Sequence, residues 1–159
     1  MLVFSVVPGV AQATNATPNT ENDSLFIKPG ATRCVSLMQM LIRGAGANLT
    51  ALTSIACRVK KWTTTAASAG TPITPAPRDP GFQAAKATAG YAAGGVTSGT
   101  GGPALLEAFG CSATAGGGFV APSADAYHTL EGAATQSIDA FVSSGLASMP
   151  YELDAAIVE

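Results

Sequence analysis

The residues from 53 to 63 alternate between apolar and polar positions more clearly than any other part of the chain. Apolar side chains fall on one side of the extended chain, and small or basic ones fall on the other. These are Ile55, Cys57 and Val59 on the first side, and Ala56, Arg58 and Lys60 on the second. A period of two residues predicts an antiparallel strand that buries one face. Trp62 falls on the polar side, where it covers a sheet edge, contacts a partner or is folded under a loop.

Shorter apolar runs bounded by turn residues predict further strands on both sides of this segment. Residues 33 to 43 are apolar on both alternating faces, so strand and helix are both open. The turn residues close to each end favour a central strand that is covered on both sides. The remaining expected strands are 24–28, 104–111, 118–121, 126–131, 136–143 and 151–159. Turns recur at about 8 to 12 residues, a spacing typical of sandwiches and barrels. We therefore expect an all-β fold, an antiparallel β-sandwich that is jelly-roll-like.

Two segments lack this periodicity. Residues 11 to 24 are polar and aperiodic, which predicts an extended N-terminal arm over residues 1–23, followed by a β-sandwich domain over 24–159. Residues 64–103 consist mainly of Ala, Gly, Thr, Ser and Pro, and predict a long loop within that domain. Loops longer than about 12 to 15 residues are usually functional or disordered. We therefore expect the same subunit or a neighbour to hold the arm, and contacts between subunits to hold the long loop. Residues 2–7 are expected to add to the sheet of a neighbour or to pack in a groove between subunits.

The low content of charged residues favours a protein that associates with other subunits over a free-standing domain. The chain of 159 residues is long enough for one core, and 47% of it is hydrophobic but only 11% is charged. A typical soluble domain carries about 25% charged residues. With a formal net charge of −2, little electrostatic repulsion keeps copies apart. This favours a homo-oligomer or a subunit of a larger assembly, and the alternative is a stable but adhesive monomer.

The same composition argues against two classes of partner. Eight Lys and Arg residues against ten Asp and Glu leave no basic excess, and direct binding of nucleic acid is therefore disfavoured. No apolar stretch approaches the roughly 20 residues that a membrane-spanning helix needs, so we expect no membrane association.

Candidate chemistry is sparse. His128 is the only histidine, and Asp125 lies three residues before it, but no Gly-x-Ser-x-Gly nucleophile motif accompanies them, so a surface histidine is the simpler interpretation. The three cysteines are widely spaced and match neither a zinc site nor a disulfide framework. Four carboxylates fit best as solvated strand positions: Glu131, Asp139, Glu152 and Asp154. We expect no catalytic residue, no cofactor and no metal site, and hence no enzyme.

Three segments are distinctive when they are taken together: Arg58-Val59-Lys60-Lys61-Trp62, then 68–75, and the final strand 152–159. In composition and layout they resemble small β-sandwich virion proteins of tailed bacteriophages, of the head decoration, cement or minor structural type, over residues 24–159. The resemblance implies a non-enzymatic protein that binds the outside of a capsid, often as a trimer, and stabilises the particle through intersubunit contacts. It also implies that the major capsid protein or other virion subunits are partners, and that the location is the virion, assembled in the host cytoplasm.

Apolar and aromatic residues of the arm and the long loop are the candidate intersubunit contacts. They are Leu2, Val3, Phe4, Val6, Val7, Trp62, Phe82 and Tyr91. Alternative functions are a tail or fibre component and a pilus-type subunit, although the chain lacks a signal-peptide pattern that a pilus subunit would need. A carbohydrate-binding module with Trp62 or Tyr91 as a stacking platform is an alternative from a different class.

Overall fold

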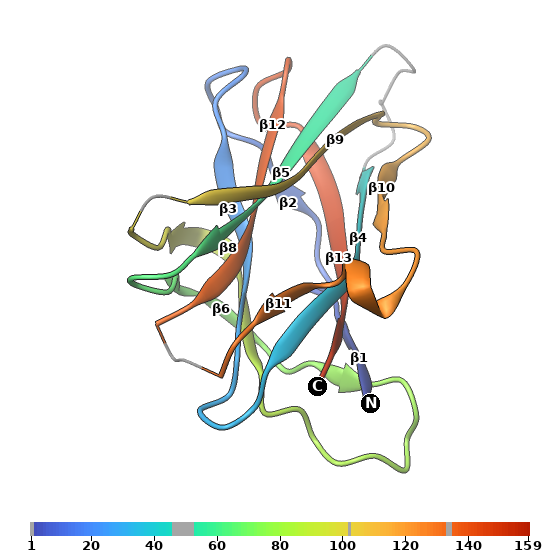
Figure 1. Ribbon diagram of the computed structural model, residues 1–159. Helices are drawn as coiled ribbons and strands as arrows, with labels where there is room; N and C mark the ends of the chain where they lie inside the picture. Colours follow the sequence, from blue (N-terminus) through green and yellow to red (C-terminus); the bar gives the residue numbers. More distant parts are fainter. Residues whose placement is uncertain (1, 46–52, 102, 133–134) are drawn as a thin grey trace.

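In the computed structural model, two antiparallel sheets pack face to face, and the two chain ends lie side by side (Figure 1). The structure describes residues 2–45, 53–101, 103–132 and 135–159. Within these ranges the only helical element is a single 3₁₀ turn, η1 (Ala124–Ala126). No helix of the described residues is long and apolar enough to cross a membrane. The antiparallel β-sandwich predicted from the alternation pattern is confirmed.

The first sheet, sheet 1, has β4 and β13 at its centre. Its main path runs in the order β10-β4-β13-β1-β7, while β11 also pairs with β4 and β2 also pairs with β13. Its strands are β1 (Val3–Val6), β2 (Gln12–Ala13), β4 (Val35–Gly44), β7 (Ala76–Pro77), β10 (Gly117–Val120), β11 (His128–Leu130) and β13 (Pro150–Val158). The segment 33–43 therefore forms a central strand with partners at both edges, as expected. The expectation that both of its faces are covered is wrong, because Leu41 on the outer face is 40% exposed.

The second sheet, sheet 2, runs in the order β6-β8-β3-β12-β5-β9. Its strands are β3 (Asn22–Lys28), β5 (Ser54–Trp62), β6 (Ser68–Ile73), β8 (Thr88–Thr97), β9 (Ala104–Ser112) and β12 (Ser137–Ser144). Ile55, Cys57 and Val59 of β5 point into the sandwich, as the period of two residues predicted. The core lies between the two sheets. Its largest fully buried side chains are Phe4, Leu25, Ile27, Leu37, Met40, Ile42, Ile55, Leu130, Ile138, Tyr151, Leu153 and Ile157.

The N-terminal residues are part of the sandwich of the same chain and do not form an extended arm outside it. β1 pairs with β13 on one side and with β7 on the other. The backbones of Leu2 and Glu159 exchange two hydrogen bonds of 3.0 Å, which join the ends of the chain. Phe4 and Val6 are fully buried because alternate residues of β1 face the core. The expectation of an arm failed because a strand of four residues is too short to show its period in sequence.

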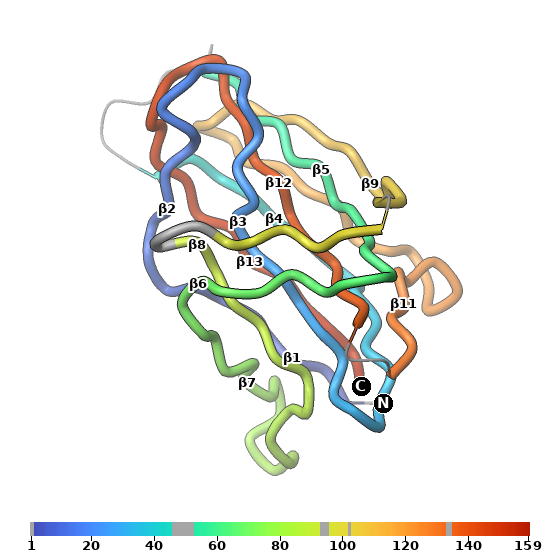
Figure 2. The backbone as a smooth tube through the Cα atoms, turned by 90° about the vertical axis from the view of Figure 1, so that its left-hand side faces the viewer, coloured from blue at the N-terminus to red at the C-terminus, as the bar shows by residue number. Residues whose placement is uncertain are grey.

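The tract 64–103 was also predicted wrongly as one long loop, because it contains β6, β7 and β8. The first part of β8 pairs with both β3 and β6, and its last part pairs with β6 alone. An isolated bridge between Thr65 and Thr100 closes the open end of this hairpin. Figure 2 shows β6 and β8 running side by side across β3. We call residues 65–73 and 88–100 together the cover ribbon.

Glycines of this tract allow its backbone to pack closely against aromatic side chains, although glycine has a low strand propensity. A Cβ atom on Gly90 would lie 2.6 Å from ring carbons of Phe26, and one on Gly99 would lie 2.5 Å from Cγ of Trp62. Both distances are far below van der Waals contact. The cover ribbon can lie this close to the aromatic side chains of sheet 2 only because it has no side chains at these two points.

Candidate functional site

The outer face of sheet 1 carries an open groove over β4, β10 and β13. It has a volume of about 410 Å³ and is lined by Leu41, Ile42, Arg43, Ala115–Gly118, Glu152 and Asp154. A smaller hollow of about 170 Å³ adjoins it and is lined by residues 7–10, Arg43, Glu152, Leu153 and Asp154. The two hollows share Arg43, Glu152 and Asp154. We call the two hollows together the outer groove. The alternation of β4 and β13 creates it, since Leu41, Arg43, Glu152 and Asp154 point outward. The residues between them, Ile42 and Leu153, bury their side chains in the core.

The outer groove combines exposed apolar side chains with a few charges. Val7, Val10 and Leu41 are between 40% and 50% exposed. Arg43 and Glu152 lie opposite each other across the strand pair, and Arg43 Nε donates a hydrogen bond of 2.6 Å to Glu152 Oε2. Burial raises the pKa of Asp154, the positive charge of Arg43 opposes this, and the negative charge of Glu152 adds to it. The lining therefore holds one cation and two carboxyl groups.

Glycine backbone forms one wall of the outer groove. A Cβ atom on Gly118 would lie 2.1 Å from the carbonyl oxygen of Met40, so the close pairing of β10 with β4 excludes any larger residue there. No aromatic ring of the described residues lines either hollow. The chemistry of the outer groove is that of an apolar contact surface with one ion pair, which fits a protein surface better than a sugar ring.

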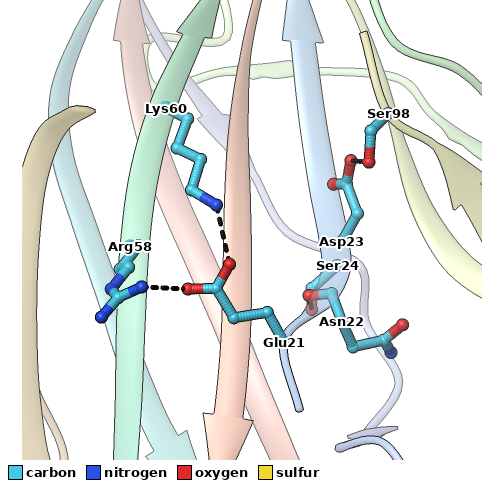
Figure 3. A network of polar contacts seen from close by, with 7 residues as sticks. All are labelled: Glu21, Asn22, Asp23, Ser24, Arg58, Lys60 and Ser98. Atoms are coloured by element: carbon cyan, nitrogen blue, oxygen red, sulfur yellow. Dashed lines mark hydrogen bonds and ion pairs between the residues drawn. The ribbon is translucent and has the colours of Figure 1, made fainter. Parts of the chain in front are cut away.

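A second polar cluster lies on the opposite side of the molecule, beneath the cover ribbon. Asp23 of β3 and Asp139 of β12 are 7% and 0% exposed. Ser98 of the cover ribbon donates a hydrogen bond of 2.7 Å to Asp23 Oδ2 (Figure 3). The backbone N–H of Ala67 donates a bond of 3.0 Å to the hydroxyl of Ser137, next to Asp139. The predicted solvated position of Asp139 is therefore wrong, because the cover ribbon closes the outer face of sheet 2 above it.

Burial is the largest cause of a raised pKa at both carboxyl groups. For Asp23 the negative charge of Asp139 raises the pKa further, and the hydrogen bond from Ser98 opposes the rise. For Asp139 the nearby polar groups of Ser137, Asp23 and Trp62 oppose it, but the pKa stays above its ordinary value. Two like charges close together in an apolar site cannot both ionise easily. Asp23 and Asp139 therefore form a buried pair that keeps a proton to higher pH than exposed carboxyl groups do, and we call them the acid pair.

Several polar atoms around the acid pair are buried without a hydrogen bond of regular geometry. They are Oδ1 of Asp23, both carboxyl oxygens of Asp139 and Nε1 of Trp62. Buried polar groups normally find partners, so an underbonded cluster of this kind is costly and responds to changes in charge. The polar groups of Ser137, Trp62 and the backbone of Gly99 lie around Asp139, so its charge state is coupled to the position of the cover ribbon.

A cluster of charged groups borders the acid pair. Glu21 bridges Lys60 Nζ at 2.7 Å and Arg58 Nη1 at 2.9 Å (Figure 3). Burial alone would raise the pKa of Glu21, but the hydrogen bonds and charges of Lys60 and Arg58 hold it below its ordinary value. Lys60 Nζ also lies 4.0 Å from the centre of the Phe141 ring, a cation–π contact. Lys60 is therefore already engaged by Glu21 and Phe141.

Trp62 is folded under the cover ribbon, which was one of the three arrangements that the sequence left open. Its side chain is 9% exposed, and its ring lies 6.4 Å from that of Phe141. A stacking platform for a sugar needs an exposed ring face. Trp62 does not offer one, while Tyr91 is half-buried and packs against the core.

The remaining candidate chemistry stays structural. His128 is half-buried, with Nε2 3.0 Å from Glu107 Oε1 and its ring edge-on to Phe119, so its partner is Glu107 and not the Asp125 considered from sequence. Cys57 is buried, as expected, and burial raises the pKa of its thiol to about 12. Among the described residues, no three His, Cys, Asp or Glu side chains lie close enough together to hold a metal ion.

The eight candidate intersubunit contacts separate into three groups. Phe4, Val6 and Trp62 are buried within the chain and cannot contact a neighbour in this structure. Leu2, Val3 and Tyr91 are half-buried. Val7 and Phe82 are exposed, and Val7 lines the outer groove. Sequence reasoning missed Val10 and Leu41, although the apolar outer face of the segment 33–43 was a signal for Leu41.

Searches of protein-family models, curated proteins and solved structures found no match to this chain.

Proposed function

We propose that this chain is a non-enzymatic structural subunit that associates with further copies of itself through the outer groove. The observation that carries the proposal is the exposure of Val7, Val10 and Leu41 around the Arg43–Glu152 ion pair. Apolar side chains gathered in a groove and edged by charges are typical of surfaces that another protein covers. Covering them would remove apolar area from water, which favours association.

A second copy of the chain is the occupant that the charges favour. Both signs of charge lie in the same groove, so Arg43 of one copy can pair with Asp154 of another. The formal net charge of −2 opposes such contacts only weakly. Self-association through one patch needs this kind of internal complementarity.

The specific form of the proposal comes from the resemblance to small virion proteins of tailed bacteriophages. We propose a decoration or cement protein that forms a homo-oligomer, a trimer in the form that the resemblance implies, and that stabilises the particle by contacts with the major capsid protein. The low charge content and the apolar outer groove support a subunit whose surface is hidden in an assembly.

The test is the mass of the full chain in solution, measured by size exclusion with light scattering across a wide range of concentration. We expect an oligomer, and we expect Leu41→Lys to dissociate it, because a lysine would place a charge in the covered groove. The matched control is Leu105→Lys on β9, a more exposed leucine outside the groove, which should leave the oligomer intact.

Two results would overturn the proposal. A wild-type chain that stays monomeric at every concentration would remove self-association. A Leu41→Lys chain that keeps the wild-type mass would show that the outer groove is not the interface. Mass spectrometry of purified phage particles tests the virion assignment separately, because self-association can hold in any assembly.

A further inference from the structure

We propose that the cover ribbon is a latch controlled by protons: a proton held by Asp23 and Asp139 keeps the ribbon closed over sheet 2, and loss of that proton releases it. The inference goes beyond the proposed function and does not depend on which partner the chain binds. It rests on where the acid pair lies, on its burial and on how the open end of the ribbon is attached.

The cover ribbon is anchored to sheet 2 where the first part of β8 pairs with β3, and only its open end, residues 65–69 and 96–100, is held by a few single bonds. Ser98 binds Asp23 and Ala67 binds Ser137, while the bridge between Thr65 and Thr100 joins the ribbon only to itself. In the described part of this end, Val96 and Thr97 of β8 pair with β6, which belongs to the ribbon, and with no other strand of sheet 2. This end can therefore lift without breaking the pairing of β3, β12 and β5.

The acid pair lies directly beneath this end. The hydroxyl of Ser98 reaches Asp23, and Gly99 packs on Trp62, whose unpartnered Nε1 faces Asp139. A neutral carboxyl group can share its proton with the neighbouring carboxylate and needs little further solvation. When the proton passes to solvent, two negative charges remain in a site closed to water. Ser98 donates to Asp23, and Ser137, Trp62 and the backbone of Gly99 lie around Asp139, but these donors do not offset the loss of hydration, which is the largest cause of the raised pKa of both groups.

The charged and titratable neighbours do not compensate for this loss. Lys60 favours ionisation of Asp23, but it is held by Glu21 and by the Phe141 ring. Arg58 is also bound to Glu21. Tyr151, across the core, has a pKa raised by burial and stays neutral. Within the cover ribbon Tyr91 is the only ionisable residue, and it packs against the core.

The direction of the switch follows from proton linkage. With the ribbon open, both carboxyl groups are in water and ionise near the ordinary pKa of about 4. With the ribbon closed, the pair keeps a proton at higher pH. The closed form therefore binds more protons, and the opening constant rises with pH by up to about tenfold per unit for each proton released.

Trp62, the only tryptophan of the chain, is a built-in reporter of opening. We expect its emission to shift to longer wavelength and its quenching by acrylamide to increase as the pH rises from about 5 to about 9, the span above the ordinary carboxyl pKa. Far-UV circular dichroism should stay constant over the same range. A fluorescence change that coincides with loss of the dichroism signal would mean global unfolding and would overturn the latch.

Amide variants separate the acid pair from other titrating groups. Asp23→Asn and Asp139→Asn each replace a carboxyl group by a neutral group of similar shape, so the pH-dependent quenching should shrink or disappear. Asp154→Asn is the matched control, because Asp154 also has a raised pKa but lies on the outer groove. The latch is wrong if Asp154→Asn removes the response, or if both amide variants of the acid pair keep it.

Hydrogen exchange of the wild-type chain keeps the test decisive even where an amide variant does not fold. Exchange rates of residues 65–73 and 96–100, divided by the intrinsic chemical rate at each pH, should rise with pH. Those of β4 and β13 should not. A uniform pH dependence across both sheets would overturn the proposal.

Discussion

The hydroxyl of Tyr151 donates a hydrogen bond of 2.5 Å to the hydroxyl of Ser24, and this bond crosses the core from sheet 1 to sheet 2. Both residues are fully buried. Ser24 in turn donates a bond of 2.8 Å to the carbonyl oxygen of Asn22, so each donor in this chain of bonds has an acceptor. The bond fixes β3, and with it the neighbouring Asp23, against β13.

Tyr151→Phe should therefore destabilise the fold. The variant removes a buried donor and leaves the Ser24 oxygen with one partner fewer, which costs about 1 to 2 kcal/mol. Urea unfolding measures the loss. Tyr91→Phe is the control, because no hydrogen bond of the Tyr91 hydroxyl is found among the described residues, and a change within about 0.5 kcal/mol is expected. Equal losses in the two variants would contradict the role given to the cross-core bond.

Gly99→Ala should loosen the cover ribbon, because the new methyl group would lie 2.5 Å from Cγ of Trp62 and 2.4 Å from the carbonyl oxygen of Thr65. Overpacking of this kind costs about 1 to 3 kcal/mol. We expect a lower unfolding midpoint and more acrylamide quenching of Trp62. Gly145→Ala is the control, because a Cβ atom added to Gly145 would have no heavy atom within 4 Å, and its unfolding midpoint and quenching should be nearly unchanged. Unchanged quenching in Gly99→Ala would show that the ribbon does not press on Trp62.

The stability of the whole fold should fall as the pH rises above the ordinary carboxyl range. The pKa values of Asp23 and Asp139 are raised in the folded chain, chiefly by burial, so the folded state binds protons that the unfolded state has released. A difference of one proton lowers the free energy of unfolding by about 1.4 kcal/mol per pH unit. Urea unfolding at mildly acidic, neutral and alkaline pH measures the slope.

Glu21 opposes this trend only at the acidic end. Its pKa is lowered, so its stabilising contribution is present above its ordinary pKa and is lost as the pH falls through the lowered value. In the Asp23→Asn variant the free energy of unfolding should therefore change less with pH from neutral to alkaline pH. It should still fall at acidic pH, where Glu21 becomes protonated. A wild-type chain that gains stability toward alkaline pH would contradict the buried proton.

The Arg43–Glu152 ion pair should matter for association more than for folding. Its two side chains are 67% and 38% exposed, and exposed pairs contribute about 0 to 1 kcal/mol. Arg43→Ala should leave the urea midpoint nearly unchanged but weaken the oligomer seen by light scattering. Arg78→Ala, which removes an exposed arginine outside the outer groove, is the control and should change neither. A large loss of stability in Arg43→Ala would show that the ion pair stabilises the fold itself, which would contradict this prediction.

The sequence by itself determined which segments are strands wherever a period of two residues runs for long enough. The alternation of Ile55, Cys57 and Val59 set both the strand β5 and the face it buries. The two apolar faces of residues 33–43 likewise predicted the central strand β4. These are properties of neighbouring residues, because side chains on a strand point to opposite sides in turn.

The tertiary structure alone decided what covers each outer face. The alternation placed Asp139 and Trp62 away from the core, and this was correct, but the cover ribbon buries them from the other side. On sheet 1 the same outward direction leaves Leu41 exposed in the outer groove. A strand's pattern specifies the direction of a side chain, whereas the layer above that side chain comes from residues distant in sequence. The acid pair and the outer groove therefore emerge only when the chain is folded.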